Sequence, residues 1–246
     1  MPDADIICTS VAKHFGDLET VAPLTITFEA GKTTALVGPS GCGKSTVLRM
    51  IAGLETPSAG GVVIGSQTPQ QLAKQGGLAM AFQDASLLPW RSVRANIALG
   101  AKLARKPATG VDDLIKLVGL EGFADHRPAA LSGGMRQRVA IARALVSDPD
   151  VLLLDEPFAS VDAITRARLN AELPELWRDT TTILVTHAVI EAVLLSDRVV
   201  VLSQRPAQIL ADIPVVLDGH RNEAMTRTTA FKTLCDEVLT ALEDTT

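Results

Sequence analysis

The stretch GPSGCGKST, residues Gly38–Thr46, decides the fold of this chain. It satisfies the pattern GxxxxGK[ST], in which glycines let backbone N–H groups close around phosphate oxygens. The apolar run TTALV leads into it and the helical pattern STVLRMIAG leads out of it. The start of that helix adds a partial positive charge. We therefore predict a nucleotide-binding loop made of Gly38, Pro39, Ser40, Gly41, Cys42, Gly43, Lys44, Ser45 and Thr46.

Four residues give this site its predicted chemistry. The ammonium of Lys44 suits the β- and γ-phosphates, and the hydroxyl of Ser45 suits Mg²⁺. The run VLLL ends in Asp155 and Glu156, which places two carboxylates at the carboxyl end of a buried strand, where open α/β sheets bind their ligands. We expect Asp155 to help coordinate Mg²⁺. We expect Glu156 to be the general base that polarises an attacking water.

Apolar runs rich in β-branched residues alternate with helical patterns, which predicts a parallel α/β fold. Between Gln83 and Pro149 the patterns are helical, which predicts a helical insertion in the sheet-based core. The segment Glu223–Leu242 is expected to be an amphipathic helix that packs on the core. The expected strands are Leu24–Phe28, Thr33–Val37, Leu78–Phe82, Val151–Leu154, Thr181–Val185 and Val199–Leu202. The expected helices of the insertion are Ser92–Leu99, Val111–Val118 and Gly133–Val146.

Composition limits the function. The 246 residues, 47% of them hydrophobic, suffice for one large domain or for a core with a subdomain. A net charge of −5 and an aromatic content of 3% argue against a nucleic-acid binder. No apolar run approaches the roughly 18 residues of a membrane span, and the amino terminus lacks the pattern of a secretory signal. Three cysteines without a CxxC pair favour a reduced cytoplasmic protein without a zinc site.

A second glycine-rich helix start occurs in the frame LSGGMRQR, at Ser132, Gly133 and Gly134. Ser132 is a good helix N-cap and the glycines leave backbone donors uncovered, so this segment is a second candidate anion site. One nucleotide cannot easily reach both sites if they lie at opposite ends of one molecule. A symmetric head-to-tail dimer resolves this, because the phosphate loop of one subunit then faces the Ser-Gly-Gly segment of the other.

These motifs, in this order, resemble the ATP-binding cassette (ABC) family of transport ATPases over about residues 5–215. Gly38–Ser45 looks like the Walker A loop, Val151–Asp155 like Walker B and Leu131–Gln137 like the signature motif. The resemblance implies an α/β P-loop NTPase (RecA-like) core with an antiparallel β subdomain. It also implies an inserted helical signature subdomain at about residues 84–149 and a C-terminal helical extension at residues 216–246. The implied cofactors are ATP and Mg²⁺, and the implied activity is ATP hydrolysis coupled to transmembrane solute transport.

Further site residues are implied by the resemblance alone. Gln83 matches the Q-loop glutamine, which senses Mg²⁺ and the transmembrane partner, and His187 matches the switch histidine that contacts the γ-phosphate. Asp162 of the D-loop would contact the opposite subunit, and Gln137 joins the Ser-Gly-Gly segment in the nucleotide site. Phe15 falls where the family stacks an aromatic ring on adenine, although Phe15 suits a core position equally well.

Finer features are similar to importer ATPases for nitrate, sulfonates and taurine, and for thiamine precursors. They are Trp90 after LLP and the LSxRPxxI pattern in VVVLSQRPAQIL. Ala188 departs from the family pattern after the switch histidine but removes no catalytic group. The resemblance implies a homodimer on ATP binding, without nucleic acid, at the cytoplasmic face of the inner or plasma membrane. Its partners would be an integral membrane permease and, indirectly, an extracytoplasmic solute-binding protein.

The segment Gln83–Leu99 is the expected contact surface for the coupling helices of the permease. Leu87, Leu88 and Trp90 are expected to be exposed there and to suit a docking groove. Local core packing of these three side chains is the alternative.

Other functional classes are weaker fits. A DNA-repair relative would need a long coiled coil between Gln83 and Ser132, and a translation relative would carry two cassettes per chain. A soluble assembly ATPase, as in iron–sulfur assembly, is compatible with the architecture, but the segments LLPW and LSxRP fit it poorly. The same two segments count against an exporter ATPase. A catalytically dead regulatory module would lack Lys44, Glu156 or His187, and all three are present.

Overall fold

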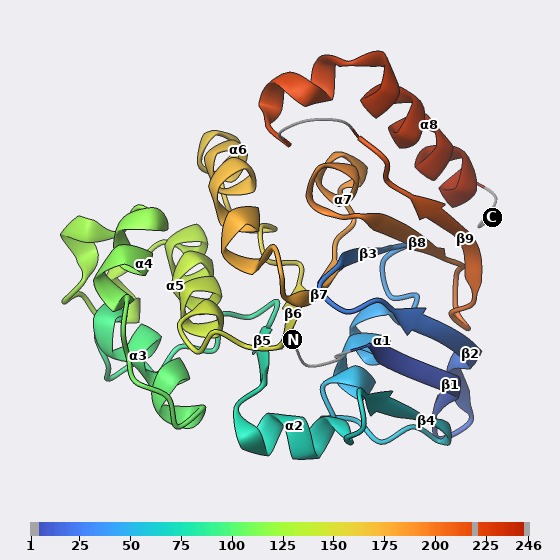
Figure 1. Ribbon diagram of the computed structural model, residues 1–246, viewed down its shortest axis with the longest axis horizontal. Coiled ribbons are helices and arrows are strands. Elements are labelled where there is room, and N and C mark those ends of the chain that lie inside the picture. Colours follow the sequence, from blue (N-terminus) through green and yellow to red (C-terminus); the bar gives the residue numbers. More distant parts are fainter. Residues whose placement is uncertain (1–4, 218–220, 244–246) are drawn as a thin grey trace.

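The computed structural model describes residues 5–217 and 221–243, which form two sheets with helices around them (Figure 1). The six-stranded sheet has the spatial order β5 (Leu78–Ala81), β6 (Val151–Asp155), β7 (Thr181–Val185), β3 (Thr33–Val37), β8 (Arg198–Leu202) and β9 (Ile209–Pro214). The three-stranded sheet has the order β2 (Leu18–Phe28), β1 (Ile6–Phe15) and β4 (Ala59–Ile64). The helices are α1 (Lys44–Ile51), α2 (Pro69–Gln75), α3 (Val93–Leu103), α4 (Val111–Leu117), α5 (Gly133–Leu145), α6 (Ala163–Glu172), α7 (Val189–Leu195) and α8 (Thr229–Glu243).

The large sheet is parallel from β5 to β8, and only the edge strand β9 runs antiparallel to its neighbour. Every residue of β3, β6 and β7 is buried, because helices or a second sheet cover both faces. The small sheet is antiparallel throughout. The described chain between β5 and β6 is helical, with α3, α4, α5 and two short 3-10 turns. These features confirm the predicted α/β class with an antiparallel sheet and an inserted helical region.

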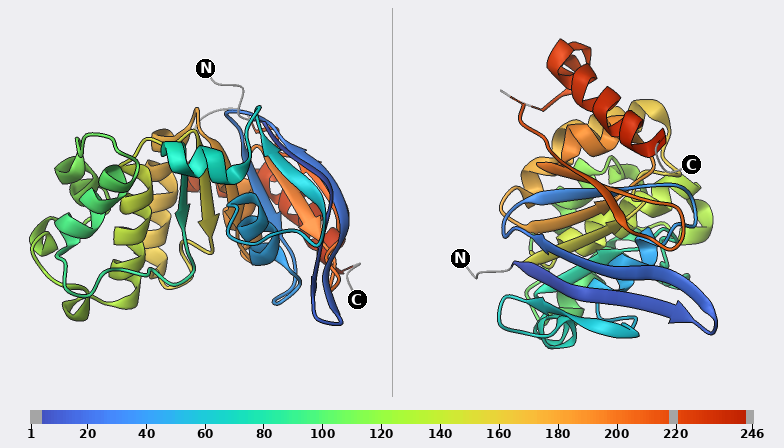
Figure 2. Two further views of the ribbon diagram at one scale, coloured as in Figure 1. Left: turned by 90° about the horizontal axis from the view of Figure 1, so that it is seen from below. Right: turned by 90° about the vertical axis from the view of Figure 1, so that its right-hand side faces the viewer.

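Successive residues of the parallel strands point into two separate apolar clusters. In β3, Ala35 and Val37 face one cluster and Leu36 faces the other. The cluster around Leu36 is completed by α1 and the small sheet. The cluster around Val37 is completed by residues of α3, α5, α6, α7 and α8. Figure 2 shows the α3–α5 layer at one end of the molecule and the small sheet at the other, so α1 and α5 lie on opposite sides of the parallel sheet.

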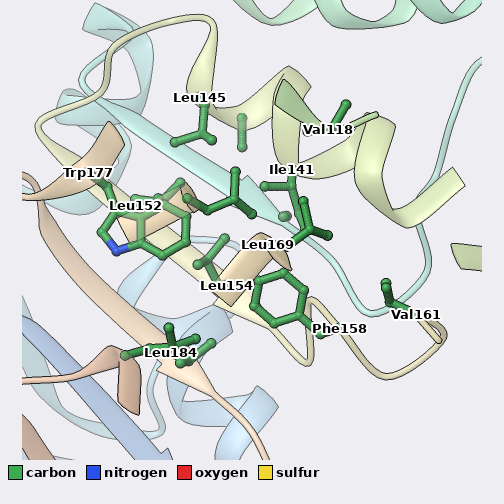
Figure 3. Packing of buried hydrophobic residues seen from close by; sticks show 14 of the residues in the cluster. Val118, Ile141, Leu145, Leu152, Leu154, Phe158, Val161, Leu169, Trp177 and Leu184 are labelled. Carbon is green, nitrogen blue, oxygen red and sulfur yellow. The ribbon is translucent and has the colours of Figure 1, made fainter. Parts of the chain in front are cut away.

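The larger cluster joins the helical layer to the sheet (Figure 3). Trp177 and Phe158 are almost fully buried there, beside Leu152 and Leu154 of β6. The helices α3 and α5 approach closely at Gly100, where an added Cβ would lie 2.0 Å from the carbonyl oxygen of Arg143. A side chain at this position would push the two helices apart.

Three strands, β1, β4 and β9, were not among the expected ones. The strands β4 and β9 lie at sheet edges, and β1 is the central strand of the small sheet. Exposed and buried residues mix along all three, so their apolar pattern is weak. The antiparallel sheet was expected only from the family resemblance. The structure also contains the short helices α2, α6 and α7, for which no range was predicted.

The C-terminal segment differs from the single helix that was expected over Glu223–Leu242. A 3-10 turn at Glu223–Arg227 comes first, and α8 starts only after Thr228, whose hydroxyl accepts a hydrogen bond from the Phe231 N–H at 3.3 Å. Phe231 and Val238 are buried, and Leu234, Cys235 and Leu242 pack on the core, as expected. Leu239 is instead 46% exposed. None of the helices within the described residues is long and apolar enough to cross a membrane.

We expect Leu169→Ala to lower the free energy of unfolding by about 3 kcal/mol, because Leu169 of α6 is completely buried between the helical layer and the sheet. Urea unfolding followed by circular dichroism measures this change. The matched control is Ile164→Ala on the same helix, which is 85% exposed and should change stability by less than about 0.5 kcal/mol. Equal losses in the two variants would contradict this packing of α6.

Candidate functional site

The loop between β3 and α1 has the backbone form of a phosphate cradle. Gly43 precedes the first helical residue with φ of 122°, a conformation that residues with a side chain rarely adopt. No side chain caps the first turn of α1, so its N–H groups remain available to an anion. Gly38 also has to be glycine, since an added Cβ would lie 2.8 Å from the Leu202 carbonyl oxygen.

Lys44 is buried inside this loop. Its ammonium donates hydrogen bonds of 2.8 Å to the carbonyl oxygens of Gly38 and Pro39. The thiol sulfur of Cys42 lies 3.8 Å from the same nitrogen. The cation is therefore fixed at the loop by backbone oxygens. Of the other predicted loop residues, Ser40 and Gly41 are exposed, whereas Pro39, Gly43, Ser45 and Thr46 are half-buried.

Ser45 and Asp155 are in contact although Ser45 follows β3 and Asp155 ends β6. The Ser45 hydroxyl donates a hydrogen bond of 2.8 Å to Oδ1 of Asp155. Asp155 is 1% exposed, and burial raises the pKa of its carboxyl while the hydrogen bond from Ser45 lowers it in part. This pair places a hydroxyl oxygen and a carboxylate oxygen side by side at the start of α1.

One carboxylate oxygen of Glu156 is contacted by both Gln83 and His187. Gln83 follows β5, Glu156 follows β6 and His187 follows β7, and these three strands are neighbours in the sheet. The Gln83 amide donates a hydrogen bond of 3.1 Å to Oε2 of Glu156, and Nδ1 of His187 lies 3.6 Å from the same oxygen. The structure thus brings together three residues that the sequence analysis assigned separately.

The backbone of Glu156 is itself unusual. Its φ is 48°, in the left-handed region that residues with a Cβ avoid, and its N–H donates to the Val185 carbonyl at 2.9 Å. Strain of this kind costs of order 1–3 kcal/mol and persists only where the surroundings impose it. Here the bond to Val185 fixes the turn, and the turn aims the carboxylate at Gln83 and His187.

Two residues that the sequence analysis missed lie beneath His187. The Thr186 hydroxyl accepts a hydrogen bond from the Ala188 N–H at 3.1 Å and donates one of 2.7 Å to Oε2 of Glu191. Glu191 is 6% exposed, and its Oε1 has no hydrogen-bond partner. The available signal was the pattern THAVIE, in which a hydroxyl and a carboxylate flank His187 at the start of α7.

The second glycine motif starts α5. The Ser132 hydroxyl accepts a hydrogen bond of 3.2 Å from the Met135 N–H, which confirms Ser132 as the N-cap. Gly134 lies against the segment before α6, where an added Cβ would be 2.6 Å from the Ser160 carbonyl oxygen. Asp162 caps α6, and the hydrogen bond from the Thr165 N–H holds its pKa below the ordinary value. These residues share the side of the sheet that faces away from α1.

Gln137 and Phe15 occupy contrasting places. Gln137 is 3% exposed, and its amide donates a hydrogen bond of 3.0 Å to the Phe82 carbonyl, so it ties α5 to the end of β5. Phe15 ends β1 and is 48% exposed, which excludes the core position considered for it. The ammonium of Lys13 lies 4.8 Å from the centre of the Phe15 ring, a cation–π arrangement.

Comparison with known proteins decides the family. The ABC transporter family model matches residues 21–159. An aliphatic sulfonates import ATP-binding protein, SsuB of Burkholderia thailandensis, is 43% identical over 96% of this chain and 68% of that protein. The chain belongs to the ABC transporter family. It is an ABC ATPase, and the resemblance drawn from its sequence motifs is confirmed.

Two further proteins are similar to this ABC ATPase, one in sequence and one in structure. An uncharacterized ABC transporter ATP-binding protein of Methanocaldococcus jannaschii is 44% identical over 85% of the chain and 81% of the relative. A dimeric structure of the ATP-binding cassette MJ0796, in a post-hydrolysis state bound to ADP and Pi, superimposes with a TM-score of 0.76. That similarity covers 87% of this chain and all of the cassette at 26% identity. The predicted P-loop NTPase fold of this ABC ATPase is therefore confirmed.

We expect Glu191→Gln to become more stable relative to the parent ABC ATPase as the pH rises. Burial raises the pKa of Glu191, and the hydrogen bond from Thr186 lowers it in part. The folded parent binds this proton more tightly than the unfolded chain, so it loses stability as the pH rises from the unfolded pKa, about 4.3, through the raised folded value. The glutamine does not titrate. Urea unfolding between pH 4 and pH 8 measures the difference, which should grow and then level off.

The control for this comparison is Glu121→Gln, because Glu121 is exposed in a 3-10 turn far from α7 in the sequence. Its stability difference from the parent should stay nearly constant over the same pH range. A Glu191→Gln difference that is flat, or that shrinks with rising pH, would show that Glu191 is not held in a charge-excluding site.

Proposed function

We propose that this ABC ATPase is the nucleotide-binding subunit of an importer that powers uptake of a small solute through a separate membrane permease. The solute class we propose is the nitrate, sulfonate and taurine type or the thiamine-precursor type. The observation that carries the ATPase site is the convergence of Gln83 and His187 on the Glu156 carboxylate beside the phosphate loop. The import direction is supported by the relative whose name assigns it aliphatic sulfonate import.

In this proposal, ATP binds with its adenine on Phe15 and its phosphates in the loop Gly38–Thr46. The exposed ring of Phe15 offers a stacking surface for adenine. Backbone N–H groups at the start of α1 receive the phosphate oxygens, and Lys44 turns from the loop carbonyls toward the β- and γ-phosphates. Loss of its bonds to Gly38 and Pro39 is offset by the stronger attraction between the ammonium and the phosphate charge.

The residues at the loop suit the magnesium ion that accompanies ATP. Mg²⁺ prefers oxygen ligands, keeps several waters and is usually held by one or two protein oxygens plus substrate phosphates. The Ser45 hydroxyl and the Asp155 carboxylate, 2.8 Å apart, and the amide oxygen of Gln83 form such an oxygen set. When bound, the ion would screen the negative charge of the phosphates. Binding of the ion would require the Asp155 carboxyl to be ionised, against the effect of burial on its pKa.

The proposed hydrolysis uses Glu156 as the general base. Its carboxylate accepts a proton from a water whose oxygen attacks the γ-phosphorus while the bond to the bridging oxygen of ADP breaks. The hydrogen bond from Gln83 fixes Oε2 of Glu156 and leaves the second oxygen to orient the water. His187 and Lys44 stabilise the charge that develops on the γ-phosphate. Thr186 and Glu191 hold the turn that carries His187.

We propose a head-to-tail homodimer on ATP binding. The helix α1, which begins at the phosphate loop, and the helix α5 lie on opposite sides of the parallel sheet. We therefore propose that one subunit does not enclose a nucleotide with both the loop and the start of α5. In the dimer, Ser132, Gly133 and Gly134 of one subunit cover the phosphates bound by the other. Asp162 lies beside this segment at the interface, and Gln137 contributes by fixing α5 rather than by touching ATP. The dimeric state of the similar cassette MJ0796 supports the homodimer.

The proposed permease contact is the region around Trp90, which is 67% exposed. A neighbouring pocket of about 350 Å³ lies between α2, α3, α5 and β5, and Leu99, Leu103 and Arg143 are among its lining residues. Leu103 is itself 71% exposed. The expected exposure of Leu87 and Leu88 is wrong, because both are half-buried and Leu87 packs on the larger apolar cluster.

We further propose an ATPase domain over residues 5–215, with a helical subdomain inserted at about residues 84–149. A C-terminal extension over residues 216–246 would follow, of which residues 218–220 and 244–246 lie outside the described structure. The proposed location is the cytoplasmic face of the inner or plasma membrane, where the subunit binds its permease and, through it, serves a solute-binding protein.

We expect Glu156→Gln to lower the kcat of ATP hydrolysis by about 10²- to 10⁴-fold while ATP still binds, because the amide cannot accept the proton of water. Release of phosphate measures kcat, and equilibrium binding of a fluorescent ATP analogue measures affinity. The matched control is Glu237→Gln on α8, an exposed position far from the site in the sequence, whose kcat should equal that of the parent. A Glu156→Gln protein that hydrolyses ATP at the parental rate would rule out Glu156 as the base.

The transport proposal is tested by purifying Glu156→Gln with ATP from membranes of the cells that make this protein naturally, followed by mass spectrometry. Slow hydrolysis should hold the closed dimer on its permease. Recovery of a polytopic permease together with a solute-binding protein supports the importer and points to the solute class. A permease without a binding protein favours an exporter, and soluble partners alone favour an assembly ATPase.

A further inference from the structure

The segment Ser203–Gln208, which connects β8 to β9, forms an outer wall of the phosphate loop, and we call it the strap. Three glycines of the loop face the strap or the residue before it. An added Cβ on Gly38 would lie 2.8 Å from the carbonyl oxygen of Leu202, and one on Gly41 would lie 3.4 Å from the Arg205 guanidinium. One on Gly43 would lie 3.2 Å from Cβ of Ala207. The strap therefore follows the loop along its length.

Arg205 makes the polar contact between the strap and the loop. Its Nη2 and Nε atoms donate hydrogen bonds of 2.7 Å and 3.2 Å to the carbonyl oxygen of Gly41. Both donors belong to one planar guanidinium, which fixes the direction of the carbonyl as well as its distance. Arg205 and Gly41 also line a pocket of about 440 Å³ between the loop and the strap.

The strap is held firmly enough to position Arg205. The Ser203 hydroxyl accepts a hydrogen bond of 3.0 Å from the Gln208 N–H, and the Ser203 N–H donates one of 2.9 Å to the Gln208 carbonyl, which closes the turn on itself. Two backbone hydrogen bonds join Ala207 to β2. The Ala207 N–H donates to the Thr20 carbonyl at 3.0 Å, and the Ala207 carbonyl accepts from the Ala22 N–H at 3.2 Å. Arg205 thus extends from a fixed turn rather than from a free loop end.

The backbone of a phosphate loop has a particular requirement. Its N–H groups must face the anion, so several of its carbonyl oxygens must find other partners. Lys44 holds the carbonyls of Gly38 and Pro39, and Arg205 holds that of Gly41. The N–H of the next residue, Cys42, donates to the Pro39 carbonyl at 3.3 Å. The peptide between Gly41 and Cys42 is therefore fixed at both of its polar atoms.

We propose that Arg205 is a positioning residue that holds the phosphate loop in its nucleotide-binding form through the carbonyl of Gly41. Lys44 leaves the loop carbonyls when it turns to phosphate, and Arg205 then remains as the cation that keeps the backbone in place. Arg205 does not touch ATP in this assignment. The inference rests on the proposed role of the loop in ATP binding, so its test must separate the two.

The first test is the rate at which an alkylating reagent modifies Cys42, which is 2% exposed and reacts only when the loop opens. Trypsin cuts the chain so that Cys8, Cys42 and Cys235 fall in three different peptides, and mass spectrometry therefore follows each thiol in the same sample. Without nucleotide, Arg205→Met should raise the Cys42 rate about fivefold. Cys8, buried in β1 with its pKa raised to about 12 by burial, reports global unfolding and should keep its rate.

The second test is the dependence of hydrolysis on ATP concentration. Arg205→Met should raise the KM for ATP about fivefold and change kcat by less than about twofold, because the loop must be ordered before it binds. Arg205→Lys, which keeps the charge but loses the planar pair of donors, should fall between the parent and Arg205→Met. The matched control is Gln208→Ala, an exposed position on the same strap, which should leave both constants unchanged.

The outcomes separate the two proposals. A parent protein that does not bind ATP would overturn the proposed function itself. A parent that binds ATP, with Cys42 rates and KM unchanged in Arg205→Met, would overturn the role of Arg205 and leave the ATPase site intact. Equal increases for Cys8 and Cys42 would also overturn it, since Arg205 would then support only overall stability. A selective increase for Cys42, together with a higher KM, supports the proposal.

Discussion

The hydrogen bond from Ser45 to Asp155 joins two parts of the site that the sheet holds apart. Ser45 lies in the first turn after β3 and Asp155 ends β6, and β7 runs between these two strands. Because parallel strands end at the same edge of a sheet, the bond spans the end of β7, where His187 follows. The phosphate loop, the carboxylates and the histidine therefore share one frame, and a shift of any of the three strands would separate them.

The site contains features that work against stability, and the apolar clusters offset them. Asp155 and Glu191 are carboxyls whose pKa burial raises, and Glu156 has a left-handed backbone. Lys44 is a buried cation held by backbone oxygens. Each would cost free energy in an ordinary core. The two clusters on the faces of the parallel sheet contribute the apolar burial that makes these costs tolerable.

The sequence predicted best the parts whose burial is uniform. Thr33–Val37 and Thr181–Val185 were predicted to the residue, because both faces of these strands are buried and their apolar runs are uninterrupted. The strand β4 was missed because it is half-exposed and glycine-rich. The motif VLLLDE identified Glu156 and the family resemblance identified His187, but neither gave the contact between them, which depends on strand order. Arg205 acts through the backbone carbonyl of Gly41, which is distant in the sequence, and a local pattern does not encode that partner.

The attachment of α5 has a mechanical consequence. The helix has 13 residues and is therefore about 20 Å long. The Gln137 amide donates a hydrogen bond to the Phe82 carbonyl, and the guanidinium of Arg143, near the C-terminal end of the helix, donates to the carbonyls of Ala85 and Ser86. The segment that follows β5 is therefore hydrogen-bonded at two places to one rigid helix, and Ser132 is the N-cap of that helix. A displacement of the segment after β5 therefore also displaces Ser132 at the start of α5, because the helix moves as a rigid unit. No change of fold is needed for this.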